Sequence, residues 1–200
     1  KGIPGQSEIV MAVGVIFVIF MLIIPIPAVF LDMLIAVNLM FSLMVLLSVM
    51  YMKNAADFTV FPALLLLTTI FRLALNVSST RMILTQGVAF DSKIIKSFGT
   101  FVVGGNYVVG LIIFLIIVAV QFIVITKGAT RISEVAARFR LDAMPNKYMA
   151  VDGELSSGII TEQEAIDRRK KIQQETDFYG SMDGASKFVK GDVTVGLLIT

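Results

Sequence analysis

The chain has 200 residues, of which 56% are hydrophobic and 16% charged, and its mean hydropathy is +0.87. Soluble domains are about 45–50% apolar and about 25% charged, so this composition indicates a membrane protein. The net charge of +2 is too small to favour nucleic-acid binding, and the chain holds no cysteine and no histidine. Thiolate nucleophiles, cysteine–zinc sites and histidine bases are therefore excluded, and we expect no metal, no cofactor and no enzymatic activity.

Charged residues are concentrated in one part of the chain. Residues 127–192 contain 22 of the 32 charged residues, with 11 lysines and arginines and 11 aspartates and glutamates. We therefore expect an all-α, polytopic membrane protein with three parts. In this interpretation, residues 1–126 form a four-span transmembrane region, 127–192 a cytoplasmic loop with helices, and 193–200 the start of a fifth span. The alternative for the apolar segment 193–200 is a short buried strand or the end of a helix.

The first apolar run is long enough to cross a membrane twice. It covers 44 residues, 9–52. At about 1.5 Å per residue, a helix of that length is about twice the ~30 Å thickness of the bilayer core. Proline denies a helix one hydrogen bond and restrains the residue before it, so Pro25 and Pro27 should divide the run into spans near 9–26 and 29–51.

Two further spans are expected after this pair. Residues 58–84 form the third, in which the apolar run is interrupted at Arg72. Residues 101–126 form the fourth, which begins with the kink Gly104-Gly105-Asn106 and ends at Lys127-Gly128.

Lysines and arginines near the span ends favour an orientation with the N-terminus inside, because positive charges accumulate in cytoplasmic loops. Three basic residues, Arg81, Lys93 and Lys96, would then lie outside. Eight would lie in the cytoplasm: Lys1, Lys53, Lys127, Arg131, Arg138, Arg140, Lys187 and Lys190. This imbalance places the loop 127–192 in the cytoplasm.

The loop carries a clear helix-start signal. Thr161 and Glu164 have the spacing of a capping box, in which each side chain bonds the backbone N–H of the other residue. The signal predicts a helix over 162–178, with Gly180 as its C-terminal stop. A shorter helix is predicted over 132–140, and turn signals lie at 144–146, 152–153 and 183–184.

A polar stripe marks the third span. Thr68, Arg72 and Asn76 are spaced four residues apart, so they lie on one face of a helix. A cation at membrane depth costs several kcal/mol and usually faces a protein interior or a wet cavity, so we interpret the stripe as facing other parts of an assembly. The alternative is that the third helix ends early and Arg72 extends its side chain to the membrane surface.

Asp32 is the expected counter-charge of Arg72. If the second span starts outside near residue 29 and the third starts inside near residue 58, Asp32 lies about 5 Å and Arg72 about 9 Å below the outer surface. These depths predict an intramembrane ion pair. Neutralising each residue should then destabilise the assembly, with less than additive losses in the double variant.

The charged loop residues form no catalytic or metal motif. Asp152-Gly153-Glu154 lacks the ligand count of an EF-hand, and Gly104-Gly105 lacks the lysine of a P-loop. From the pattern alone, the charged side chains of the loop are explained by exposure to water on the surface of the loop.

The segment RISEVAARFRLDAMPNKYMAVD (131–152) resembles the signature of the FHIPEP family, the large export-gate proteins of bacterial flagella and type III secretion injectisomes. Four further segments also resemble the family: PALLLLTTIFRLALNVSSTR (62–81), FVVGGNYVVG (101–110), FIVITKGATR (122–131) and DFYGSMDGASKFVKGD (177–192). The chain departs from the usual pattern at Asn146 and Tyr148, where the family has glycine and glutamine. Asp-Gly-Glu-Leu at 152–155 also differs from the flagellar Asp-Ala-Asp-Leu, although DFYG and RLALN look more flagellar.

The resemblance implies a homo-oligomeric, ring-forming component of the bacterial inner membrane that couples protein export to the proton motive force. Its implied partners are other export-apparatus membrane proteins, the lipid bilayer, and exported substrates and chaperones, which dock mainly on a C-terminal domain outside these 200 residues. Nucleic acid is not among them. Carried over residue by residue, the coupling or gating positions are Arg72, Lys147 and Asp152, and the signature positions are Arg131, Glu134, Arg138 and Asp142.

Without histidine, a proton sensor in this chain needs a carboxylate, and Asp152 is the candidate. Its protonation would shift the loop between two packings. Two other functions remain open. One is a stand-alone proton- or ion-coupled transporter, a class that often shows internal repeats not found here. The other is a structural ring scaffold whose charges only hold subunits together.

Overall fold

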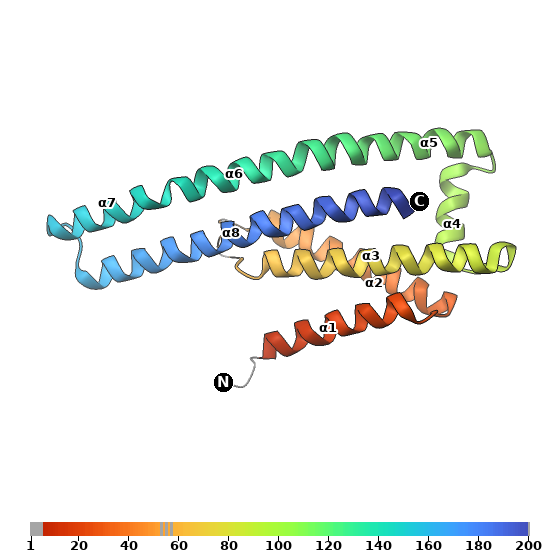
Figure 1. Cartoon of the computed structure of the whole chain (residues 1–200), viewed down its shortest axis with the longest axis horizontal. Helices are drawn as coiled ribbons and strands as arrows, with labels where there is room; N and C mark the ends of the chain where they lie inside the picture. The colour runs from red at the N-terminus through yellow and green to blue at the C-terminus, as the bar shows by residue number, and fades with distance from the viewer. Residues whose placement is uncertain (1–5, 53, 55, 57, 200) are drawn as a thin grey trace.

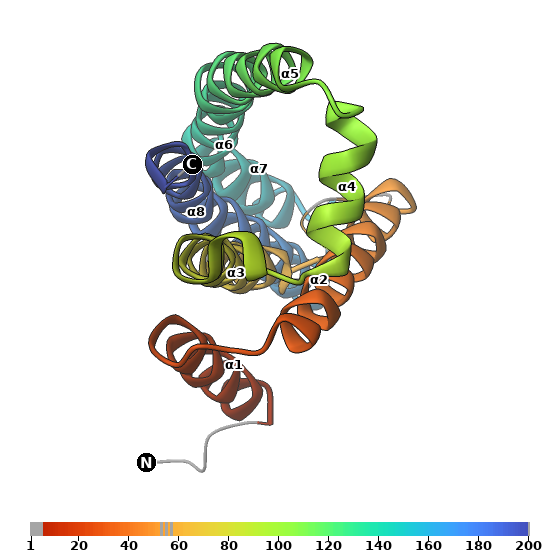
Figure 2. The same cartoon turned by 90° about the vertical axis from the view of Figure 1, so that its right-hand side faces the viewer.

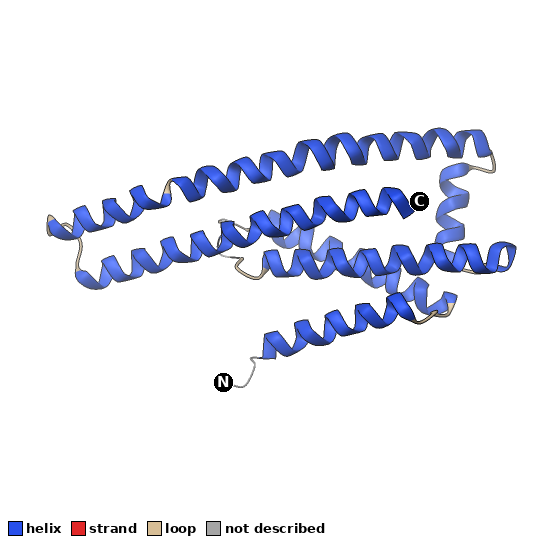
Figure 3. Ribbon diagram, in the orientation of Figure 1, coloured by secondary structure: helices blue, strands red, loops and turns tan. Residues whose placement is uncertain are grey.

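The computed structural model describes residues 6–52, 54, 56 and 58–199, and every regular element among these residues is a helix. Figures 1 and 3 show that α3 (Phe61–Gln86), α8 (Glu162–Ile199) and the long helix from α5 to α7 (Tyr107–Ser156) run nearly parallel to one axis. In the same views α2 (Ala28–Met50) crosses obliquely behind α3, and a helical hairpin extends beyond the other helices at one end. The all-α class expected from the sequence is therefore confirmed. Lys1, Lys53 and Thr200 lie outside the described residues.

The first two helices form the expected hairpin. α1 covers Gln6–Ile23 and α2 covers Ala28–Met50, and the chain turns between them at Pro25 and Pro27. Pro27 has a φ of −63° and stands directly before α2, where its missing N–H costs no helical hydrogen bond.

The third helix, α3 (Phe61–Gln86), is the centre of the bundle. Figure 2 shows it between α1, α2 and α8, and it contacts all three. Pro62 lies in its first turn, and Gly87 ends it with a φ of 51°. The apolar core around α3 draws on three helices: Val18 and Met21 from α1, Leu31 and Leu34 from α2, and Ala74, Leu75 and Met82 from α3.

Polar side chains of α3 fasten the end of α1. The Arg81 guanidinium donates to the carbonyls of Leu22, Ile23 and Ile24 over 2.9–3.2 Å. These are carbonyls that the helix itself leaves without partners, and a cation also suits the negative end of the helix dipole. Ser78 adds a 3.0 Å bond to the carbonyl of Met21.

A short helix crosses the bundle before the next long one. α4 (Lys93–Val103) runs across the long direction in both views, and Gly104 and Gly105, with φ of 59° and 78°, turn the chain into α5 (Tyr107–Val120). Residues 101–103 therefore belong to α4, and the long helix of the fourth predicted span begins only at Tyr107.

The long helix does not end where the sequence predicts. From α5 it continues through a π-helical segment, η3 (Gln121–Ala129), into α6 (Thr130–Asp142). The helix thus runs past Lys127-Gly128, whereas the end of the membrane span at this point stays a prediction. A single glycine inside a helix costs only about 1 kcal/mol, which neighbouring turns and packing can offset.

α7 and α8 form the rest of the hairpin. α7 covers Met144–Ser156, with Pro145 in its first turn, so the turns predicted at 144–146 and 152–153 are helical instead. α8 covers Glu162–Ile199, 38 residues, and runs back beside α6 and α7 (Figure 1). The predicted stop at Gly180 and turn at 183–184 are therefore also wrong. Packing of α8 against α3, α6 and α7 outweighs the cost of its glycines.

Three helical stretches are long and apolar enough to cross a membrane: Ala28–Met50, Phe61–Ala89 and Tyr107–Ser156. A shorter apolar helix, Ala12–Ile23, lies where the first span is predicted. These findings support several spans, whereas the count of four plus the start of a fifth stays a prediction. Residues 193–199 are the last turns of α8 and not a strand.

The capping box is confirmed, and it determines the pH below which the start of α8 frays. The Thr161 N–H donates to the Glu164 carboxylate over 2.8 Å, the Thr161 hydroxyl adds a 3.0 Å contact, and the Glu164 N–H returns a 3.3 Å bond. The backbone bond first, and then the hydroxyl, lower the pKa of Glu164 below its ordinary 4.5.

A carboxyl with a lowered folded pKa stabilises the fold above its unfolded pKa, and that contribution is lost as the pH falls through the folded pKa. We predict that the start of α8 frays only below pH 4.5. In an NMR titration, Thr161→Ala should raise the pKa of Glu164 part of the way to 4.5, because the backbone bond remains, whereas Thr161→Ser should leave it low. An unchanged pKa in Thr161→Ala would contradict the capping role.

Candidate functional site

Arg72 forms an ion pair with Asp192, a residue 120 positions further along the chain. The Arg72 Nε donates to Asp192 Oδ2 over 3.1 Å, and Nη2 contacts the same oxygen. The Asp192 side chain is only 4% exposed, whereas that of Arg72 is 46% exposed. The Arg72 side chain thus contacts α8 within the same chain.

The buried carboxylate is not fully satisfied. Asp192 Oδ1 has no hydrogen-bond partner in the described part of the chain, and the same is true of Asn38 Oδ1 on α2. Most buried polar atoms in folded proteins are hydrogen-bonded. Two unpartnered acceptors beside one ion pair therefore distinguish this region from ordinary core.

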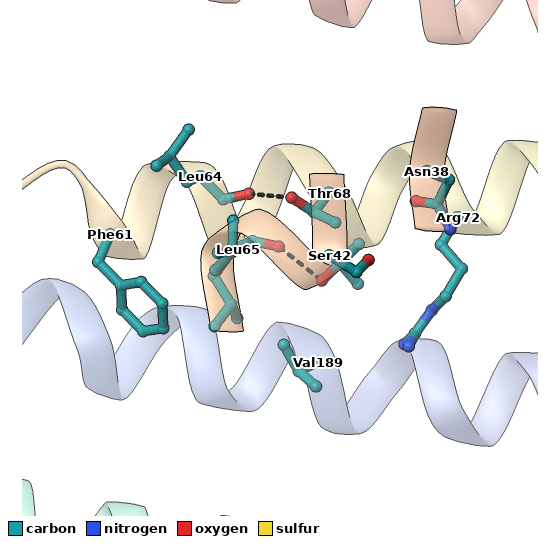
Figure 4. Close-up of a pocket in the computed structure, with 10 residues that line it drawn as sticks. Asn38, Ser42, Phe61, Leu64, Leu65, Thr68, Arg72 and Val189 are labelled. Atoms are coloured by element: carbon teal, nitrogen blue, oxygen red, sulfur yellow. Dashed lines mark hydrogen bonds between the residues drawn. The ribbon is translucent and has the colours of Figure 1, made fainter. Parts of the chain in front are cut away.

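A cavity of about 260 Å³ lies beside Arg72, between α2, α3 and α8. Figure 4 shows the Arg72 side chain reaching toward α8, and Asn38 and Ser42 of α2 also line the cavity. The Thr68 and Thr69 hydroxyls donate to the carbonyls of Leu64 and Leu65 over 2.7 and 2.6 Å. The Thr68 and Thr69 hydroxyl protons are thus already used within α3.

Other members of the predicted stripe are placed differently. Asn76 is exposed on the surface of α3. Asp32, the predicted partner of Arg72, instead accepts from the Ser92 hydroxyl and, over 2.8 Å, from the Lys93 backbone N–H. It therefore stabilises the start of α4, where a carboxylate suits the positive end of a helix. The predicted Asp32–Arg72 pair is wrong, because similar depths along two helices say nothing about which way each side chain points.

Lys147 and Asp152, the coupling positions implied by the resemblance, form ion pairs across the hairpin. Lys147 contacts Glu175, and Asp152 Oδ1 lies 2.5 Å from Arg169 Nη2. These side chains are between one third and three fifths exposed. Along α8, Arg169 and Asp192 are separated by about 35 Å at 1.5 Å per residue, so the structure does not bring Asp152 and Arg72 together.

The signature positions divide into two groups. Arg131 and Glu134 line a second cavity with Lys127 and Lys190. Arg138 and Asp142 are exposed on α6. In the chain as described, no group of three or more histidine, cysteine, aspartate or glutamate side chains is arranged to hold a metal ion.

Asp192 is the functional candidate that the sequence analysis missed. It was assigned to the end of the charged loop, although it directly precedes the apolar segment 193–200. A lone carboxylate at the edge of an apolar run was the available signal, since such a residue needs a partner at membrane depth.

Together these features define a class of protein: a helical membrane protein with several helices long and apolar enough to span a bilayer, in which a long helical hairpin contacts α3 through a buried carboxylate. The FHIPEP family model matches residues 18–200, so the chain belongs to the FHIPEP family.

Relatives are found in several bacteria. The chain is 58% identical over 203 residues to flagellar biosynthesis protein FlhA of Borreliella burgdorferi, covering 100% of this chain and 29% of that protein. It is 55% identical to flagellar biosynthesis protein FlhA of Bacillus subtilis, covering 98% and 28%. It is 53% identical to low calcium response locus protein D of Yersinia pestis, with the same coverage. The chain thus spans less than a third of the length of these relatives. No solved structure matches it significantly.

The exposure of the two partners predicts unequal losses when the Arg72–Asp192 pair is broken. Arg72→Gln leaves a buried carboxylate without a cation and should cost about 3 kcal/mol of unfolding free energy. Asp192→Asn leaves a half-exposed guanidinium that can reach water, so it should cost less, about 1 kcal/mol. The double variant should lose less than the sum, measured by unfolding in mixed micelles.

A second double-mutant cycle, on Asp32 and Arg72, serves as the control for the Arg72–Asp192 cycle. Asp32→Asn combined with Arg72→Gln should give additive losses, because the structure places these residues in separate contacts. Additivity for Arg72 with Asp192, or strong coupling for Arg72 with Asp32, would contradict the structure.

Proposed function

We propose that the chain is the membrane portion of a bacterial flagellar protein export gate, or of the corresponding gate in type III secretion, and that it couples the proton motive force to protein export. The family match over residues 18–200 and two relatives named as flagellar biosynthesis proteins support this proposal. The same proposal places the chain in the inner membrane with the loop 127–192 in the cytoplasm. It assigns the chain no catalytic step.

One observation carries the coupling proposal: a single helix, α8, runs from the loop hairpin to the ion pair with α3. α8 is continuous from the hairpin to its last turns, where Asp192 contacts Arg72 on α3. A displacement of the hairpin along its length must therefore move the carboxylate beside Arg72. This is the connection that a machine needs if an event in the loop is to change a site among the spans.

The ion pairs across the hairpin are weak, so little free energy is needed to break them. Pairs exposed to this extent contribute about 0.2–1 kcal/mol each. One elementary charge moved through 100 mV is worth about 2.3 kcal/mol. The passage of one proton across the membrane therefore releases more free energy than the Asp152–Arg169 pair contributes, so a small part of it is enough to break this pair in the loop. We propose that protonation of Asp152 releases Arg169 and shifts the packing of α7 on α8.

The exposed apolar surfaces agree with an assembly in a membrane. In the most apolar 18-residue segment of Tyr107–Ser156, 0% of the residues are buried within the chain. In the corresponding segment of Ala28–Met50, 6% are buried. Surfaces of this kind require lipid or other proteins as neighbours. The proposed partners are further copies of the chain in a ring, other export-apparatus membrane proteins, and exported substrates with their chaperones.

An export assay tests the role of Asp152 with a neighbouring pair as control. In the full-length protein, Asp152→Asn should reduce export at a normal proton gradient by about tenfold or more, the loss of about 1.4 kcal/mol of coupling. Glu154→Gln removes the adjacent Glu154–Arg168 pair of similar exposure and should leave export nearly unchanged. Normal export by Asp152→Asn would count against the coupling role.

Two further measurements separate the alternative functions. If Lys147 and Asp152 are both neutralised and export stays at the wild-type level, the chain acts as a structural ring scaffold. If the chain alone in liposomes takes up a solute against a proton or sodium gradient, it acts as a self-contained transporter. The proposal predicts neither result.

A further inference from the structure

A second group of charges lies where the long apolar helix meets the hairpin. Thr126, Lys127, Arg131, Glu134 and Lys190 line a cavity of about 310 Å³, which we call the basic pocket. Three cations and one carboxylate give it two net positive charges. Among the side chains that the structure describes, no carboxylate lies within ion-pair distance of these three basic groups, and the Lys127 ammonium lies 5.3 Å from the centroid of the Phe122 ring.

The pocket also contains a polar atom without a partner. The Thr126 hydroxyl is buried and makes no hydrogen bond to the described residues. Buried hydroxyls normally find partners, so this one fits an oxygen acceptor held in the pocket. Thr126 and Lys127 belong to the π-helical segment η3, a backbone form that recurs at functional sites.

The position of the pocket relative to the membrane indicates where such an acceptor comes from. Residues 107–126 contain no charge, and 20 helical residues are about 30 Å long, the thickness of a bilayer core. This stretch is not covered by the rest of the chain, because its most apolar window is 0% buried. Lys127 therefore follows a lipid-facing span and lies at the depth of the lipid headgroups.

We propose that the basic pocket binds the phosphate of an anionic phospholipid headgroup. The Arg131 guanidinium and the Lys127 and Lys190 ammonium groups match a phosphate oxyanion, and the Thr126 hydroxyl is a further donor. Two net positive charges disfavour the ammonium of a zwitterionic headgroup. A bound phosphate would join η3 and α6 to α8, and so fasten the base of the hairpin at the membrane surface.

Glu134 separates this proposal from a purely structural role. If the cations of the pocket serve only to balance Glu134, then Glu134→Gln should loosen the hairpin as much as removal of a cation does. If the pocket holds a phosphate, Glu134→Gln removes the carboxylate that lines the pocket and repels it, so binding should strengthen.

Native mass spectrometry of the full chain tests the proposal. The chain is released from micelles containing equal amounts of phosphatidylglycerol and phosphatidylcholine, and the retained lipid is counted. We expect retention of phosphatidylglycerol, weakened about fivefold by Lys190→Gln or Arg131→Gln. Lys190→Arg should retain the lipid, and Glu134→Gln should retain more. Lys93→Gln is the matched control. Lys93 begins α4, which precedes the N-terminal end of α5, whereas the basic pocket lies beyond the C-terminal end of α5.

Three results would overturn the proposal. The first is equal retention of the two lipids by the wild-type chain. The second is loss of lipid in Glu134→Gln comparable to that in Lys190→Gln. The third is displacement of the lipid by soluble glycerol phosphate at an equal concentration, which would identify a free anion as the ligand. Circular dichroism of each variant checks that the helices are intact, and the test does not depend on the export function.

Discussion

The contact between Asp192 and Arg72 constrains the whole arrangement of the chain. A carboxylate that is 4% exposed is tolerated only beside a cation, so the last turns of α8 must lie against the middle of α3. Because α8 is a single helix of 38 residues, about 57 Å long, the same contact fixes the direction of the entire hairpin. The capping box at Thr161 and the ion pairs between α7 and α8 then position the far end of the hairpin.

Charged side chains in the apolar region each join two elements. Arg72 joins α3 to α8, Asp32 joins α2 to the start of α4, and Arg81 on α3 satisfies the carbonyls that end α1. Few alternatives exist for an ionised group at this depth, so these contacts specify which helices are neighbours. The ion pairs of the hairpin are exposed and weak by comparison. The hairpin is instead held by a buried apolar cluster between α7 and α8, which includes Val151 and Ile172.

Local chemistry predicted the long helices but not α4 and α7, and it did not predict where the helices end or which helices are neighbours. The prolines at 25 and 27, the capping box at Thr161 and the long apolar runs gave the correct helices. Glycine was the main source of error, because Gly128 and Gly180 lie inside helices whose packing offsets their low propensity. The partner of Arg72 was missed because depth along a helix does not determine the direction of a side chain.

Cysteine cross-linking tests the central contact most directly, because the chain has no native cysteine. A short bifunctional thiol reagent should join Thr68→Cys to Val189→Cys within one chain, giving a cross-linked species of monomer size. These two residues of α3 and α8 line the same cavity, and replacing them leaves the Arg72–Asp192 pair in place. The pair Asp32→Cys with Arg72→Cys should stay unlinked under the same conditions. Failure of the first pair to link, cross-links only between chains, or efficient linking of the second pair would contradict the placement of α8 against α3.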